Sequence, residues 1–95
     1  MATLAVGEMR QTFEETVEWA RDQPSSQHRR HELARLATLI EASAATAYGT
    51  LRTVCAGGDA LRQIAGAKLL TQRANVEVQE TCLRLRGLDL SLIHI

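Results

Sequence analysis

The chain has 95 residues, 45% of them hydrophobic, and its eleven basic residues balance eleven acidic ones. This balance excludes a strongly basic surface for nucleic acid or anionic membrane, and no segment approaches the roughly 20 apolar residues of a membrane span. We therefore expect neither nucleic acid nor membrane as a partner. The length makes one small domain at most, or a piece of a larger one. Partners often complete the core of a chain of this size.

The first predicted helix spans residues 3–22. Its apolar residues recur every three or four positions and its charged residues fill the other face, which is the pattern of an amphipathic helix. The apolar positions are Val6, Met9, Phe13, Val17 and Ala20. Pro24 disfavours helix at the residue before it, and Ser25 or Ser26 is expected to cap the next helix through its hydroxyl oxygen.

The second and third helices are predicted over residues 26–56 and 60–86. Between them, Gly57 or Gly58 is expected to adopt a left-handed conformation and Asp59 to cap the third helix. The apolar series of the second helix is Leu33, Leu36, Ala37, Ile40, Ala44, Ala47, Leu51 and Val54. That of the third is Leu61, Ile64, Ala65, Leu69, Ala74 or Val76, Cys82 and Leu83.

Short connections between long helices predict an all-α fold, an up-and-down bundle of three antiparallel helices that is an incomplete four-helix bundle. Leu4, Leu70 and Val78 lie off the main apolar stripes, so a fourth helix or a second copy of the chain is expected to cover them. Cys55 and Cys82 are interpreted as buried free thiols. The domain is assigned to residues 1–87, and residues 88–95 are interpreted as a non-native or disordered tail.

Two polar groups near the start of the second helix have a functional interpretation. His28, His31 and Glu32 have a spacing compatible with a metal site, but they are better explained as polar residues at a helix N-terminus, so no metal is predicted. Arg29, Arg30 and Arg35 form a basic cluster suited to phosphate. The alternative is a solvated face whose arginines pair with Glu32 and with acids of the first helix.

Three segments, in this order, resemble the C-terminal helical domain of the acyl-CoA dehydrogenase family. They are Trp19-Ala20-Arg21 at a helix end, Gln27 six residues before Leu33-Ala34, and Ala67-Lys68-Leu69 in a helix that finishes at Gly87. The resemblance covers residues 4–87. It implies the C-terminal bundle of a flavoenzyme that binds FAD and removes a proton and a hydride from an acyl-CoA.

The resemblance also implies which residues approach FAD. The family's Arg-x-Gln-Phe-Gly segment, whose arginine reaches the FAD pyrophosphate, matches Arg21 and Gln23. The chain departs from the family at the next positions, where Pro24 and Ser25 replace Phe-Gly and the loop is shorter. The flavin contact by Arg21 and Gln23 is implied by the match at Arg21 and Gln23 alone.

Further cofactor positions come from two other family segments. Gln27 is expected to make a polar contact to the cofactor. In the family's Gln-x-x-Gly-Gly-x-Gly loop, which touches FAD of the adjacent subunit, Arg84 takes the place of the glutamine and Gly87 that of the first glycine. The family's catalytic glutamate and its two other domains lie outside this chain, so no catalytic residue is assigned.

The sequence thus predicts a fragment of a cytoplasmic FAD-dependent acyl-CoA dehydrogenase, not catalytic and not expected to bind FAD alone. In the intact enzyme, a homodimer or homotetramer, it would contribute the oligomerisation bundle and part of the FAD-binding edge. The alternative is a free-standing helical module that dimerises through the "ASAATA" surface and the third helix without a cofactor.

Overall fold

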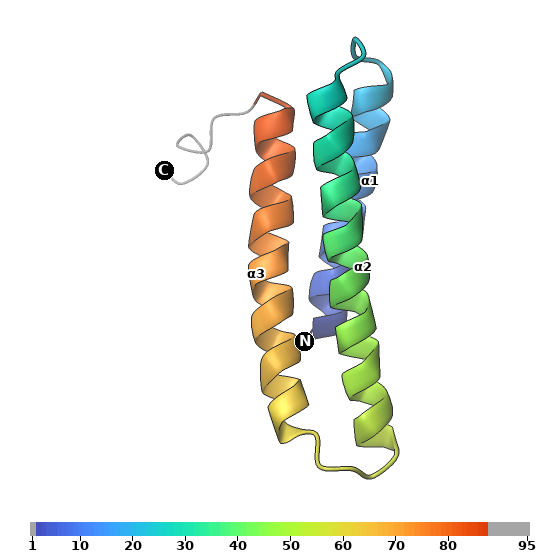
Figure 1. Ribbon diagram of the computed structural model, residues 1–95, viewed down its shortest axis with the longest axis vertical. Helices are drawn as coiled ribbons and strands as arrows, with labels where there is room; N and C mark the ends of the chain where they lie inside the picture. Colours follow the sequence, from blue (N-terminus) through green and yellow to red (C-terminus); the bar gives the residue numbers. More distant parts are fainter. Residues whose placement is uncertain (1, 88–95) are drawn as a thin grey trace.

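The computed structural model describes residues 2–87, which form three antiparallel helices (Figure 1). These are α1 (Ala2–Arg21), α2 (Gln27–Cys55) and α3 (Leu61–Leu85). Each end differs by a single residue from the predicted bounds. The prediction of an all-α bundle of three helices is confirmed. The tail predicted over residues 88–95 lies outside the described residues.

Local side chains explain where the helices begin and end. Ser26 has an extended backbone (φ −142°), and its hydroxyl oxygen accepts a 3.1 Å hydrogen bond from the backbone N–H of Arg29, so it caps α2 as predicted. Gly57 has a φ of +79° just beyond the end of α2, a conformation that glycine adopts without strain. The predicted cap at Asp59 is one residue off. Ala60 is the N-cap of α3, and the Asp59 carboxylate accepts from the N–H of Leu61.

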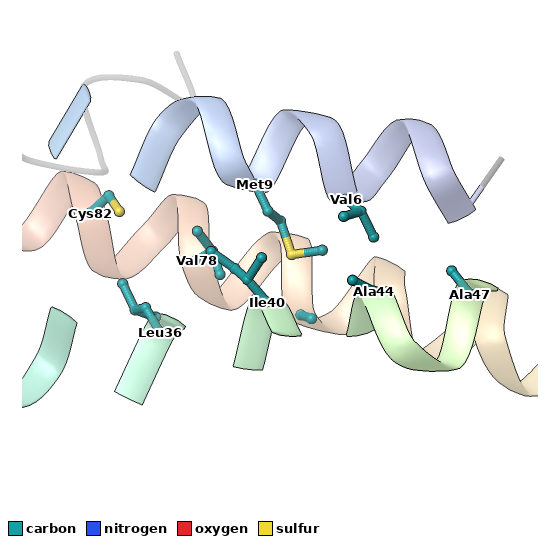
Figure 2. Packing of buried hydrophobic residues seen from close by; sticks show 9 residues of the cluster. Val6, Met9, Leu36, Ile40, Ala44, Ala47, Val78 and Cys82 are labelled. Carbon is teal, nitrogen blue, oxygen red and sulfur yellow. The ribbon is translucent and has the colours of Figure 1, made fainter. Parts of the chain in front are cut away.

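The core is a single narrow cluster along the bundle axis (Figure 2). Its members come from all three helices: Val6, Met9, Leu36, Ile40, Ala44, Ala47, Ala74, Val78 and Cys82. Phe13 packs against its edge, and no aromatic side chain of the described residues is fully buried. Leucine, valine and alanine therefore form most of the core, as the composition indicates.

The two cysteines have different surroundings. Both are free thiols, and Cys82 is buried as predicted, where desolvation raises the pKa of its thiol. Cys55 is exposed, contrary to the prediction, because it lies in the last turn of α2, beyond the part of that helix that α1 covers. Only the Cys82 thiol contributes to the packing of the core.

The face that α3 turns towards the bundle also differs from the predicted one. Leu61, Ile64 and Leu69 were expected inside and are exposed, whereas Val78, expected off the stripe, is fully buried. The α3 residues buried against the other helices are mostly small: Ala67, Thr71, Ala74, Thr81 and Cys82. Small side chains let helix backbones approach closely, so the bulky leucines lie on the other faces of α3.

Buried hydroxyl groups occur on all three helices without leaving an unpaired polar atom. Thr16, Ser43 and Thr71 each donate to the backbone carbonyl four residues earlier, at 2.9, 2.9 and 2.7 Å. Within the described residues, no buried side-chain nitrogen or oxygen lacks a hydrogen-bond partner. Each hydroxyl is satisfied within its own helix, so burying it carries little of the usual cost of a buried polar group.

We expect Leu36→Ala to lower the free energy of unfolding by about 2–5 kcal/mol, because Leu36 is fully buried and truncation leaves a cavity. Leu51→Ala is the matched control on the same helix. Its side chain is 49% exposed, so its loss is expected to stay below about 1 kcal/mol. Urea unfolding followed by circular dichroism measures both, and equal losses would contradict this assignment of the core.

Candidate functional site

One end of the bundle gathers most of the residues that the sequence singles out. We call it the polar end: it consists of the C-terminus of α1, the connection to α2, the N-terminus of α2 and the C-terminus of α3 (Figure 1). The antiparallel order of the helices brings these segments together. All five predicted cofactor residues belong to it: Arg21, Gln23, Gln27, Arg84 and Gly87.

A stacked arginine holds the connection between α1 and α2. The guanidinium of Arg29 lies 5.3 Å from the centroid of the Trp19 ring and donates a 2.8 Å hydrogen bond to the carbonyl of Pro24. A cation over an indole face is attracted by the ring quadrupole. Arg29 therefore links the end of α1, the connection and the first turn of α2, which orders the side of the polar end nearest α1.

A cleft of about 300 Å³ separates the start of α2 from the end of α3. It is lined by Ser26, His28, Arg29, Glu32, Thr81, Arg84 and Leu85. The positive end of the α2 dipole adds to the two arginines, and Glu32 is the single carboxylate in the lining. The electrostatics of this cleft favour an anion, and arginine with helix N–H groups is a combination typical of phosphate sites.

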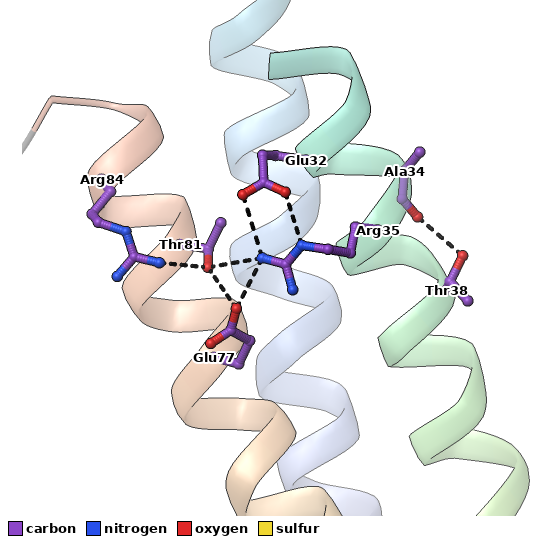
Figure 3. A network of polar contacts seen from close by, with 7 residues as sticks. All are labelled: Glu32, Ala34, Arg35, Thr38, Glu77, Thr81 and Arg84. Carbon is purple, nitrogen blue, oxygen red and sulfur yellow. Dashed lines mark hydrogen bonds and ion pairs between the residues drawn. The ribbon is translucent and has the colours of Figure 1, made fainter. Parts of the chain in front are cut away.

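A polar network joins α2 and α3 beside the cleft (Figure 3). Arg35 donates to Glu32 and to Glu77, at 2.8 Å in each case. Arg84 donates to the hydroxyl of Thr81 at 3.1 Å, and that hydroxyl in turn contacts Glu77. The network holds Arg84 at the cleft wall. Arg35 is paired with Glu32 and Glu77, so it is not available to an external anion.

The hydrogen bond from Arg35 lowers the pKa of Glu32, and the same contact, together with Glu77, raises the pKa of Arg35. Both groups therefore carry their full charges at neutral pH. The expected pairing of this basic cluster with acids of the first helix is wrong for Arg35. Its partners lie on α2 and α3, because α3 and not α1 passes this side of α2.

The five predicted residues occupy different places within the polar end. Arg84 lines the cleft, whereas Arg21 is exposed and pairs loosely with Glu18 at 3.7 Å. Gln23 is half-buried in the connection, and Gln27 is exposed in the first turn of α2, outside the cleft lining. Gly87 has a φ of +75° just beyond α3, a conformation that L side chains rarely adopt.

Sequence reasoning missed Thr81 and the bridge from Arg35 to Glu77. The available signal is the spacing on α3, where Glu77, Thr81 and Arg84 follow at steps of four and three and so share one face. Within residues 2–87, no group of three or more His, Cys, Asp and Glu side chains is placed to hold a metal ion. None of the helices found there is long and apolar enough to cross a membrane.

The fold and the polar end define a helical-bundle domain with a cleft whose lining favours an anion. A family model described as acyl-CoA dehydrogenase, C-terminal domain, matches residues 1–90. The chain therefore belongs to the acyl-CoA dehydrogenase family, and the resemblance noted in the sequence is confirmed. Comparisons with curated proteins and with solved structures give no significant match.

We expect Ser26→Ala to destabilise the protein by about 1 kcal/mol, because it removes the oxygen that accepts from the N–H of Arg29 at the start of α2. The neighbouring Ser25→Ala is the matched control. The Ser25 hydroxyl receives only an exposed side-chain hydrogen bond from Arg30, so a few tenths of a kcal/mol are expected. Thermal unfolding measures both, and a larger effect at Ser25 would contradict the assigned cap.

The lowered pKa of Glu32 predicts how the free energy of unfolding changes at acidic pH. A carboxylate with a depressed folded-state pKa contributes stability that is present above its unfolded pKa and lost as the pH falls through the folded value. Glu32→Gln is therefore expected to reduce stability at pH 7 and to weaken the pH dependence below about pH 4.3.

Stability measured by urea unfolding between neutral and acidic pH tests this expectation. Glu14→Gln is the control, since Glu14 is exposed and takes part in none of the ion pairs found in residues 2–87. A Glu32→Gln profile parallel to that of the unsubstituted chain would contradict the assigned role of this pair.

Proposed function

We propose that the chain is part of an FAD-dependent acyl-CoA dehydrogenase, to which it contributes an oligomerisation bundle and one edge of the FAD site. The observation that carries the proposal is the family match over residues 1–90. The domain would end near residue 87, with residues 88–95 as a tail. The intact enzyme would be a cytoplasmic homodimer or homotetramer that acts on an acyl-CoA.

The polar end fits the diphosphate of such a cofactor. Arg84 is held in place by Thr81, Arg29 and His28 line the opposite wall, and the free N–H groups of α2 begin beside them. Arg21, Gln23 and Gln27 lie at the same end of the bundle but outside the cleft lining, and they would add polar contacts to a ligand that extends beyond the cleft. Gly87, without a side chain, allows close approach of a ligand at the end of α3.

The chain's own residues would bind and orient the cofactor without taking part in bond breaking. FAD, when bound in the intact enzyme, accepts the hydride removed from the acyl chain. The acids of α1 that stand nearest the polar end, Glu14, Glu15 and Glu18, are all exposed on the bundle surface. We therefore assign no catalytic residue to this chain, and the proposal is restricted to binding and assembly.

A second candidate function is an interaction module that dimerises without a cofactor. The exposed apolar side chains of α3 favour it, since Leu69 and Val76 are each more than half exposed. The "ASAATA" surface supports it less. Ser43, Ala44 and Ala47 from that segment are buried inside the bundle and are not available to a partner.

Titration with ADP, followed by NMR, distinguishes the two functions. ADP presents a diphosphate like that of FAD, so we expect weak binding, with a Kd of about 1 mM or above, and shifts confined to the amides of residues 26–29 and 84–87. Adenosine, which has no phosphate, is expected to produce none of these shifts.

Substitution of one arginine provides the matched control. Arg84→Gln is expected to weaken ADP binding about tenfold, because it removes a charged donor from the cleft. Arg62→Gln, the same change on an exposed residue at the other end of α3, is expected to leave binding unchanged. Equal shifts with ADP and adenosine, or none with either, would refute the cofactor edge and favour the interaction module.

A further inference from the structure

An apolar stripe runs along the outward face of α3. Leu69 and Val76 are 51% and 56% exposed, and Leu83, which is half-buried, continues the spacing seven residues later. The residues that α3 buries in the bundle have the same spacing, at Ala67 and Ala74. Each stripe residue follows a buried one by two positions, about 200° round the helix. The outer stripe, defined as Leu69, Val76 and Leu83, therefore faces away from the bundle at Leu69 and Val76 and ends at the half-buried Leu83.

Spacing by seven indicates what kind of surface covers the outer stripe. An apolar residue at every seventh position stays aligned with another long helix, as does one of the two apolar positions in each heptad of a coiled coil. The occupant that matches the outer stripe in length and period is therefore a helix that carries the same repeat.

We propose that the outer stripe is covered by the same stripe of a second copy of the chain, which runs antiparallel about a two-fold axis beside Val76. This inference rests on the oligomerisation part of the proposed function and specifies its surface. Leu69 and Leu83 lie seven residues on either side of Val76. The two-fold axis therefore places Leu69 of one copy against Leu83 of the other and Val76 against Val76.

Charges beside the outer stripe match the same arrangement. Arg73 and Glu80 each lie about one turn from Glu77, which pairs with Arg35 of α2, so both flank the stripe on its α2 side. In an antiparallel pair of helices, the α2 flank of one copy lies against the α2 flank of the other, and the residues of the two flanks follow in opposite directions. Arg73 of one copy then stands opposite Glu80 of the other, and the symmetry forms this pair twice.

Neither charge is strongly engaged within the part of the chain that the structure describes. None of the ion pairs in residues 2–87 includes Arg73, and Glu80 has only a 4.0 Å contact with Arg84, whose side chain is half exposed. Both are therefore available to a partner. Arg73 lies three residues before Val76 and Glu80 four residues after it, so their opposite signs on either side of the two-fold axis make the surface self-complementary.

A parallel pairing of the two stripes is disfavoured by charge. It would bring the α2 flank of one copy against the α1 flank of the other. The α1 flank is identified by Asn75, which hydrogen-bonds to Glu8 of α1, and Lys68 lies seven residues before it on the same face. Lys68 would then lie beside Arg73, and like charges in this position oppose association.

Sedimentation equilibrium of the 95-residue chain at low salt tests the proposal. We expect a reversible dimer with a Kd of roughly 10 µM to 1 mM, since a single helix pair makes a small interface. Val76→Glu is expected to raise the Kd at least tenfold, because it places two like charges next to each other at the two-fold axis. Leu61→Glu, at a 74% exposed residue of α3 outside the stripe, is the matched control and should leave the Kd unchanged.

Charge exchange tests the antiparallel order. Arg73→Glu and Glu80→Arg should each weaken the dimer about three- to tenfold, and the double variant should restore it. Without such restoration the antiparallel register is wrong. A strict monomer at 1 mM overturns both the surface and the self-association of this chain, whereas a dimer that Val76→Glu leaves intact overturns the surface alone.

Cysteine cross-linking supplies a second measurement in a Cys55→Ser background, which removes the exposed native thiol. Val76→Cys should form a disulfide-linked dimer on mild oxidation, because the two-fold axis brings the two copies of this residue together. Leu69→Cys should form far less, since its expected neighbour is Leu83. Equal cross-linking at both positions would refute the register. Circular dichroism confirms that each variant remains helical.

Discussion

Close approach of the helices through small side chains is the constraint on which the rest of the structure depends. Alanine, serine and threonine form much of the buried surface, and no large aromatic residue lies in the bundle interior. Hydroxyls in such a core would be costly unless bonded, and Thr16, Ser43 and Thr71 meet this need by donating to carbonyls of their own helices. The core is thus narrow, and bulky apolar residues are left on its outside.

The two ends of the bundle differ because the helices differ in length. α1 has 20 residues whereas α2 has 29, so the far ends of α2 and α3 extend beyond the start of α1. There an open groove of about 560 Å³ is lined by Leu4, Leu51 and Ile64 among others. At the polar end all three helices are present, and their charged side chains reach one another. The charged cleft and the apolar groove therefore lie at opposite ends of the bundle.

Helix existence and helix ends were predictable because they depend on local signals. Ser26, Pro24 and Gly57 mark boundaries through their own backbone preferences, and the structure places every helix end within one residue of the expectation. The inward face of α3 was not predictable in the same way. That helix carries apolar residues on two opposite faces, and periodicity alone favours the one with larger side chains, Leu69 and Val76, over the alanines that the close packing selects.

The polar end was predictable only in part. Residue identities came from the family resemblance, but their arrangement depends on contacts between distant segments. Arg35 and Glu77 are 42 residues apart in sequence, and their pairing follows from how α3 lies against α2. Arg84 reaches the cleft for the same reason, whereas Gln27 is not part of the cleft lining although it lies in the first turn of α2. Tertiary packing therefore decides which of these polar residues share one site.

The stacking of Arg29 on Trp19 makes the fluorescence of this tryptophan a candidate probe of the polar end. Trp19 is the only tryptophan of the chain, and it lies beneath a guanidinium that belongs to the cleft wall. We therefore expect its fluorescence to respond to events at the polar end. The only tyrosine, Tyr48, is exposed on the far half of α2. Selective excitation of the indole thus follows one end of the bundle without labelling, while tyrosine emission responds to the other.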